Sequence, residues 1–153
     1  MRYGHRMHAT METALASALR DQGKRVTPQR LAIARTLQEL DRHVTAEALY
    51  GEVSRRLPGV SLPTVYSTLE LLEDLGLARR VATVGGSVVY DPRVAEHHHL
   101  VCRECGAIAD LDGEVDPAAL LALARARGFM PEGAQVAITG VCAECRARAG
   151  APA

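Results

Sequence analysis

The stretch SLPTVYSTLELLEDLGL, residues 61–77, decides the fold of the N-terminal half of the chain. Ser61 is a favoured helix N-cap, Pro63 is tolerated in a first helical turn, and Gly76 suits a helix end. The apolar residues between them recur at helical spacing, which predicts an amphipathic helix with one buried face. These residues are Val65, Leu69, Leu72 and Leu75.

The segments before this helix carry helix signals of their own. Thr10, Thr27 and Thr45 are N-cap candidates, and Pro28 occupies the favoured first helical position. The predicted helices cover residues 11–22, 28–40 and 46–56, with a connector at 41–44. Beyond Gly76, two strands are predicted at residues 79–82 and 88–90, joined through Gly85 and Gly86. Helix, turn, capped helix and small hairpin are the plan of a winged helix-turn-helix domain.

The N-terminal end of the helix at 62–75 carries side chains that a recognition helix could present to DNA. Thr64, Tyr66 and Ser67 lie off its apolar face. A tyrosine ring can pack on a thymine methyl group, and hydroxyls can bond base edges or phosphate. The predicted phosphate contacts are Arg25, Arg30, Arg55 and Arg56. The alternative is a plain surface helix with Tyr66 half-buried.

Charge separates the two halves, although the formal net charge of the chain is zero. Residues 1–69 carry ten Lys and Arg against six Asp and Glu, whereas residues 70–153 carry eight against twelve. A basic first half beside an acidic second half indicates separate tasks. The excess is small, so contact with nucleic acid requires a local patch. Residues 1–9 are expected to form a flexible tail.

All four cysteines of the chain occur in two CxxC motifs, Cys102 with Cys105 and Cys142 with Cys145. Two such turns aim four thiolates at one point, which is the ligand set of a tetrahedral structural zinc. Two disulfides or four unrelated thiols are the alternatives. Disulfides need an oxidising compartment. The sequence shows neither a signal-peptide pattern nor an apolar run of membrane length, so a cytoplasmic location with reduced thiols is expected.

The segments around the cysteines predict a small α/β module. Strands are predicted at residues 99–102, 107–111 and 135–141, and a helix at 116–127. Thirty-six residues separate the two CxxC motifs, so zinc would join the ends of a strand–helix–strand unit. The predicted fold class is therefore α+β. Its parts are a winged helix-turn-helix domain at 1–90, a hinge at 91–97 and an α/β domain at 98–153.

A triple histidine, residues 97–99, directly precedes the first CxxC motif. Alternation along a strand places His97 and His99 on one face and His98 on the other. Imidazole together with carboxylate suits iron(II), manganese(II) or zinc(II). The nearby carboxylates are Asp91, Glu96 and Asp110. A site that also used His43 of the first half would tie the two halves together. The alternative is a hydrophilic strand edge.

These motifs together resemble the ferric uptake regulator superfamily of bacterial metal-dependent repressors, over residues 11–146. The matching stretches are RVTPQR at 25–30, SLPTVYSTLELLEDLGL at 61–77, HHHLVCRECG at 97–106 and GVCAEC at 140–145. The resemblance implies a homodimer, joined through the C-terminal domain, that binds double-stranded DNA at an AT-rich palindromic operator. It also implies a zinc held by the four cysteines and a regulatory metal between the domains.

Within this superfamily, the peroxide-sensing branch uses three histidines and two aspartates for the regulatory metal. Its pattern maps onto His43, Asp91, His97, His99 and Asp110. The resemblance thus implies regulatory iron(II) or manganese(II) and peroxide sensing through oxidation of ligand histidines. Iron-sensing members more often carry glutamate at the two carboxylate positions, and zinc- or manganese-responsive repression are further alternatives. Iron-sensing members also have an additional metal site, with a histidine at the position of Ala134. Many members of the superfamily have an arginine at the position of Ser67, so this residue bears on base preference.

A zinc hydrolase is the interpretation from a different class. It would need an open coordination position and a general base, for which Glu96 or Glu104 could serve. The sequence has no HExxH motif, and a hydrolase would leave the helix-turn-helix half unexplained. The sequence therefore predicts a regulator and not an enzyme.

Overall fold

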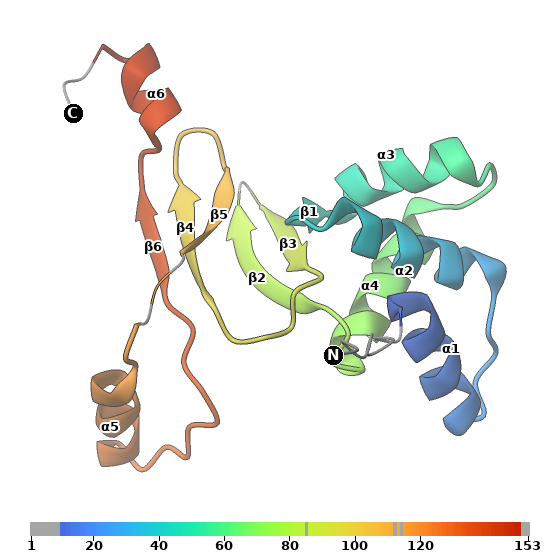
Figure 1. The fold of residues 1–153 in the computed structure, drawn as a ribbon, viewed down its shortest axis with the longest axis horizontal. Coiled ribbons are helices and arrows are strands. Elements are labelled where there is room, and N and C mark those ends of the chain that lie inside the picture. Colours follow the sequence, from blue (N-terminus) through green and yellow to red (C-terminus); the bar gives the residue numbers. More distant parts are fainter. Residues whose placement is uncertain (1–9, 85, 112, 114, 151–153) are drawn as a thin grey trace, which may run out of the picture. The chain divides into compact units, whose positions relative to one another are not determined.

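The computed structural model describes residues 10–150 except 85, 112 and 114 (Figure 1). The tail expected at residues 1–9 and Gly85 of the predicted hairpin turn lie outside the described residues. The chain divides into two compact units, Met1–Val94 and Ala95–Ala153. The division falls within residues 91–97, the segment predicted to be a hinge.

Four helices make up most of the first unit: α1 (Met11–Asp21), α2 (Pro28–Leu40), α3 (Ala46–Arg56) and α4 (Leu62–Asp74). Each begins after a threonine or serine whose side-chain oxygen accepts a hydrogen bond from the backbone N–H three residues on. These caps are Thr10, Thr27, Thr45 and Ser61. Such a cap contributes about 1 kcal/mol, and the observed helix starts agree with the predicted ones.

The core of the first unit is built from leucine, valine and isoleucine, because the chain has no tryptophan and one phenylalanine. The apolar stripe of α4 is buried at Val65, Leu69 and Leu72. Leu75 at the helix end is only half-buried, and Gly76 follows with a φ of +67°. The other helices contribute Leu15, Leu19, Ile33, Leu37, Leu49 and Val53 to the same core.

A three-stranded antiparallel sheet completes the first unit, with strand order β1-β3-β2. The strands are β1 (Val44–Thr45), β2 (Arg79–Val84) and β3 (Ser87–Asp91). The prediction of a plain connector at 41–44 is wrong at its last residue, since Val44 pairs with Tyr90 of β3. A two-residue strand is too short to show alternation, and its partner is distant in sequence. Helices and sheet together form the predicted winged helix-turn-helix fold.

The second unit contains a three-stranded sheet and two helices. The sheet consists of β4 (His98–Cys102), β5 (Ile108–Leu111) and β6 (Ala137–Gly140), in the order β5-β4-β6. Strand β4 runs antiparallel to β5 and parallel to β6. The helices are α5 (Ala118–Ala126) and α6 (Ala143–Arg148). Helix α6 was not predicted, because it is short and begins inside the second CxxC motif.

Helix α5 and strand β6 bury none of their side chains in the structure as described. The exposed apolar residues of this region are Leu120, Leu123, Phe129, Met130 and Ile138, and we call them the apolar face. Their exposed fractions range from 51% at Leu120 to 90% at Met130, which is unusual for side chains of this size. No helix in the described part of the chain combines the length and apolar character needed to cross a bilayer.

Candidate metal centres and nucleic-acid interface

The four cysteines meet at one end of the second sheet. Strand β4 ends at Cys102 and β6 leads into Cys142, and the parallel register pairs Cys102 with Gly140. One ligand atom from each of the four cysteines lies within 4.8 Å of the others. The Sγ–Sγ distances are 3.9 Å for Cys102 and Cys145 and 3.8 Å for Cys105 and Cys142.

These distances identify the kind of centre that the sulfurs can form. A tetrahedral zinc with Zn–S bonds of about 2.3 Å has S–S edges of about 3.8 Å. A disulfide requires about 2.05 Å, and all four thiols are free. The residues therefore fit a structural zinc, as predicted from the two CxxC motifs, and the disulfide alternative does not hold in this structure.

Hydrogen bonds and burial act in opposite directions on the two buried thiols. The backbone N–H of Cys142 donates to Cys102 Sγ over 3.3 Å. This contact, followed by the backbone N–H of Cys105, lowers the pKa of Cys102 to about 6. Burial raises the pKa of Cys145 to about 12, and the hydrogen bond from Arg148 opposes this increase. Zinc binds cysteine as thiolate, so zinc affinity is expected to rise with pH.

Two residues of the first unit form one imidazole–carboxylate pair. His43 lies just before β1 and Asp91 ends β3, and the pairing of Val44 with Tyr90 brings these neighbouring positions together. His43 Nε2 lies 3.2 Å from Asp91 Oδ2. The other oxygen, Asp91 Oδ1, accepts from the backbone N–H of Arg93 over 2.8 Å, which fixes the carboxylate orientation. We call this pair the first ligand set.

Three residues of the second unit form a second ligand set. His99 of β4 pairs with Asp110 of β5, so strand register places the aspartate beside the histidines. Asp110 Oδ1 lies 3.4 Å from His97 Nε2 and 3.9 Å from His99 Nε2. The rings of His97 and His99 are 4.5 Å apart between centroids. The predicted same-face placement of His97 and His99 is therefore observed, although β4 begins only at His98.

Contacts from two backbone groups and one side chain orient the histidine rings. His97 Nδ1 lies 2.7 Å from the carbonyl oxygen of Ala95. Donation from Nδ1–H to this carbonyl leaves Nε2 as the nitrogen available to a metal. His98 Nδ1 accepts from the backbone N–H of Val136 over 3.1 Å, so this ring is bonded to the segment before β6 and belongs to neither ligand set. Gln135 Nε2 lies 3.3 Å from His99 Nδ1.

The α4 residues predicted to contact DNA make hydrogen bonds within the first unit. The Tyr66 hydroxyl donates to the carboxylate of Glu47 on α3. This bond raises the pKa of Tyr66 and lowers the pKa of Glu47. Ser67 is exposed and donates to the carbonyl of Thr64 over 3.1 Å, and Tyr66 is partly buried against the core. The Tyr66 ring is therefore half-buried.

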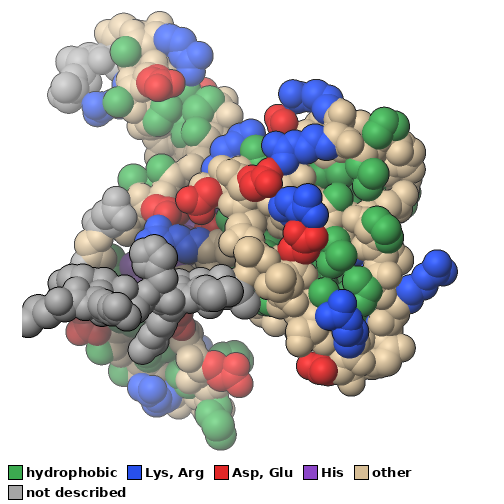
Figure 2. Space-filling model, turned by 45° about the vertical axis from the view of Figure 1, so that its right-hand side comes forward, with side chains coloured by type: hydrophobic (Ala, Val, Ile, Leu, Met, Phe, Trp, Pro, Cys, Tyr) green, Lys and Arg blue, Asp and Glu red, His purple; other side chains and the backbone are tan. Residues whose placement is uncertain are grey.

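The arginines predicted to contact phosphate differ in their present partners. Arg25 is exposed, and its carbonyl accepts from Arg30 Nη1 over 3.2 Å. Arg56 pairs with Glu39 of α2, and Arg55 pairs with Glu52. On the visible face of the first unit, Figure 2 shows Lys and Arg side chains interspersed with acidic and apolar ones. Because Arg56 is paired with Glu39, a phosphate contact by Arg56 would compete with this ion pair.

A winged helix-turn-helix unit, a four-thiolate zinc centre and two imidazole–carboxylate sets define a class of proteins, the metal-responsive winged-helix regulators. The chain matches the ferric uptake regulator family over residues 21–139. It belongs to this family of metal-responsive transcriptional regulators, which confirms the resemblance drawn from its motifs.

Individual relatives differ in the signal that their names record. The chain is 37% identical over 131 residues to the transcriptional regulator FurA of Mycobacterium tuberculosis, covering 85% of this chain and 88% of the relative. It is 34% identical over 137 residues to the peroxide-responsive repressor PerR of Staphylococcus epidermidis, covering 89% and 90%. A solved zinc uptake regulator bound to zinc and DNA has a TM-score of 0.62 at 25% identity, covering 94% of this chain and 99% of that one.

Proposed function

We propose that this chain is a homodimeric, metal-dependent transcriptional repressor that responds to peroxide. The observation that carries the proposal is the pairing of histidine with aspartate in both ligand sets, at 3.2 Å between His43 and Asp91 and 3.4 Å between His97 and Asp110. Three imidazoles and two carboxylates suit iron(II) or manganese(II). We propose that both sets serve one exchangeable regulatory metal, which favours the conformation that binds DNA.

Aspartate at both carboxylate positions supports the peroxide-responsive branch over the iron-responsive one. The chain resembles the peroxide-sensing pattern at all five positions, and a PerR is among its relatives. Iron(II), when bound, supplies the electron transfer that activates peroxide. The chain supplies histidine rings as the target. One peroxide molecule would transfer one oxygen atom into a ring C–H bond of His43 or His97, and its other oxygen atom would leave as water. A modified ring is a poorer ligand, so metal and DNA would be released.

Iron(II)-loaded protein exposed to one equivalent of peroxide is expected to gain the mass of one oxygen atom on a peptide that contains His43 or His97. Manganese(II)-loaded protein should remain unmodified, because manganese(II) does not activate peroxide in this way. Asp110→Glu should blunt the oxidation while DNA binding is kept, since a longer carboxylate changes the coordination side of the iron. Peptide mass spectrometry and DNA-binding titrations measure these outcomes.

Asp116→Glu is the matched control, because Asp116 lies just before α5, accepts from the backbone N–H of Ala118 over 2.8 Å and belongs to neither ligand set. It should oxidise as the unsubstituted protein does. Absence of histidine oxidation, with DNA release following iron chelation alone, would contradict the peroxide proposal and assign the chain to iron-responsive repression. A response to zinc or manganese alone would assign it to those branches.

The apolar face supports the homodimer. Leu123, Phe129 and Met130 are more than 60% exposed, and α5 has an Ala- and Leu-rich sequence with no buried side chain in the described structure. Large apolar side chains left this exposed are candidates for burial in an interface. A second copy of the chain is the partner we propose, because two-fold dimers present two equal recognition helices to a palindromic operator. An AT-rich sequence is the operator we expect.

Tyr66→Ala is expected to weaken binding to the specific operator by about tenfold to a hundredfold, with little effect on random DNA. The ring would lose its contact with a thymine methyl group, whereas nonspecific binding depends mainly on phosphate contacts. Tyr66→Phe, which keeps the ring and frees Glu47, should retain most of the affinity. Arg25→Ala should weaken both kinds of DNA and reduce the salt dependence by about one phosphate contact. Equal losses on specific and random DNA for Tyr66→Ala would refute the base-reading role.

We propose no enzymatic activity for the zinc centre. Four thiolates complete a tetrahedral coordination, which leaves no open position for a substrate or a nucleophilic water. A compartment that keeps thiols reduced, such as the cytoplasm, would preserve these ligands. A purified, zinc-loaded protein that cleaves ester or peptide model substrates at a rate that scales with zinc content would overturn this view.

A further inference from the structure

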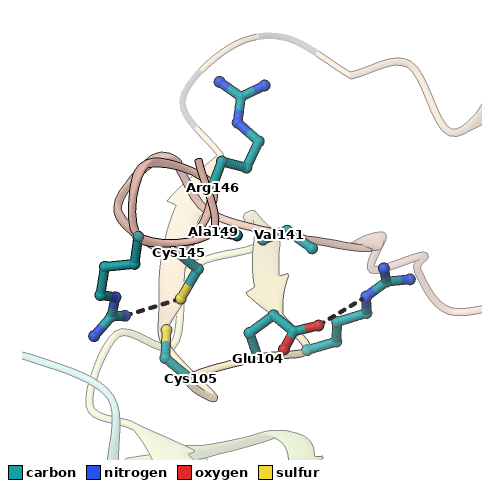
Figure 3. A pocket seen from close by; sticks show the side chains of 8 residues that line it. Glu104, Cys105, Val141, Cys145, Arg146 and Ala149 are labelled. Carbon is teal, nitrogen blue, oxygen red and sulfur yellow. Dashed lines mark hydrogen bonds and ion pairs between the residues drawn. The ribbon is translucent and has the colours of Figure 1, made fainter. Parts of the chain in front are cut away.

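The guanidinium of Arg148 lies against the zinc-ligand cysteines. Arg148 is the last residue of α6, three positions after Cys145, so both residues lie on one side of this short helix. Arg148 Nη2 donates to Cys145 Sγ over 3.0 Å, and Figure 3 marks a hydrogen bond to the Cys145 sulfur with a dashed line. Figure 3 also shows the sulfurs of Cys145 and Cys105 facing one another. The arginine therefore approaches the centre from the pocket that borders it.

The pocket beside the cysteines has a volume of about 720 Å³ and includes two other arginines, Arg103 and Arg146. Arg103 Nε lies 3.4 Å from the carboxylate of Glu104. Among the described residues that line the pocket, Arg148 is the one whose guanidinium has a sulfur as its hydrogen-bond acceptor. Of the three arginines that line the pocket, Arg148 is therefore the one that contacts the sulfur of a zinc-ligand cysteine.

Charge explains why such a contact is useful. Four thiolates around one zinc(II) ion carry a net charge of −2, and two of the cysteines, Cys102 and Cys145, are buried. Buried charge requires hydrogen-bond donors. Cys102 Sγ receives the backbone N–H of Cys142, and Cys145 Sγ receives the Arg148 guanidinium. A charged donor gives a stronger hydrogen bond than a neutral one.

We propose that Arg148 is a positioning residue of the zinc centre. Its guanidinium donates a charge-assisted hydrogen bond to the zinc-bound thiolate of Cys145, which retains the zinc and lowers the reactivity of that sulfur towards electrophiles. The bond withdraws electron density from the sulfur lone pairs, the same electrons that an electrophile would take. The role requires only the zinc centre and holds whether or not the chain responds to peroxide.

Alkylation of the zinc-loaded dimer by N-ethylmaleimide tests the proposal. One alkene carbon of the maleimide bonds to sulfur, the other takes a proton from water, and the zinc loses one ligand. Zinc release, followed with a chromogenic chelator, is expected to be roughly five- to tenfold faster in Arg148→Ala, a range set by the strength of charged hydrogen bonds and by the screening of an exposed guanidinium. Arg148→Lys should stay within about twofold of the unsubstituted protein, because it keeps a charged donor.

Arg146→Ala is the matched control, because Arg146 belongs to the same helix and the same pocket. It should release zinc at the unsubstituted rate. In the cobalt(II)-substituted protein, Arg148→Ala should shift the sulfur-to-cobalt charge-transfer bands to lower energy, whereas Arg146→Ala should leave them in place. This spectrum reports on the sulfur itself and does not respond to a general loss of stability.

Peptide mapping at early times should find Cys145 alkylated sooner in Arg148→Ala. Equal rates and spectra for Arg148→Ala, Arg146→Ala and the unsubstituted protein would overturn the proposal. Equal acceleration by both alanine substitutions would also overturn it, because the effect would then come from net charge. If Arg148→Ala does not retain zinc during purification, the milder Arg148→Gln takes its place in the same comparison, with the same outcomes.

Discussion

Cys142→Ser is expected to yield protein that contains no stoichiometric zinc and no longer forms a dimer. Cys142 lies between β6 and α6, at the point where the second cysteine pair joins the first. Its backbone N–H supports Cys102 Sγ over 3.3 Å, and its own sulfur lies 3.8 Å from Cys105. Serine keeps the backbone but removes one of four thiolates. A structural zinc of this type contributes about 10–16 kcal/mol of apparent binding free energy in small zinc domains.

The loss of the dimer follows from the topology of the second unit. Parallel pairing of β4 with β6 connects segments on either side of α5. The zinc joins the ends of strands β4 and β6. The second unit has few buried side chains, so little packing would hold these strands together without the metal. Without zinc, β6 and the segment that leads to it from α5 would lose their fixed positions, and this stretch of the chain, from α5 to β6, carries the apolar face. Metal analysis and sedimentation measure both effects in one preparation.

Ala143→Ser is the control for Cys142→Ser, because it introduces the same hydroxyl at the neighbouring exposed position and keeps all four thiolates. It should retain one zinc per chain and the dimer. A stable dimer in unsubstituted protein that contains no zinc would show that the structural role is wrong. A Cys142→Ser protein that loses zinc but stays dimeric would separate the interface from the metal.

The helices of the first unit could be predicted closely from the sequence, because their start signals are local. A threonine or serine cap needs only the N–H three residues on, and all four caps are in place. The zinc ligands were predictable for a similar reason, since CxxC spacing constrains two sulfurs within one turn. Elements that depend on distant partners were not predictable in this way. Strand β1 exists through pairing with β3, more than 40 residues away.

Contacts made by long side chains were beyond sequence reasoning. The pairing of Arg56 with Glu39 and the bond from Tyr66 to Glu47 join different helices, and no spacing rule relates these positions. Gln135 reaches His99 from a segment 36 residues away. Arg148 follows Cys145 by one helical turn, but this spacing had no meaning before α6 was known to be helical. The residues that adjust the candidate sites were therefore found only in three dimensions.

His43→Ala is expected to abolish the stimulation of DNA binding by iron(II) or manganese(II). His43 Nε2 lies 3.2 Å from Asp91, so the substitution removes the imidazole of the first ligand set and leaves the carboxylate. Loss of even a supporting residue around a metal commonly costs 10–100-fold in affinity, so loss of a ligand should reduce metal-stimulated operator binding by at least about 100-fold. The zinc should stay in place, because the four cysteines belong to the second unit and His43 to the first.

Arg42→Ala is the matched control, because Arg42 is the exposed neighbour of His43 and precedes the same strand. It should keep one zinc per chain and the full response to added metal. The two variants are compared by titrating an AT-rich palindromic duplex with and without metal, together with thermal melting. Metal-stimulated binding that survives in His43→Ala would exclude this histidine from the regulatory site. Loss of zinc and of the melting transition in the same variant would instead assign His43 a role in folding, because a ligand that acts only on the exchangeable metal leaves both unchanged.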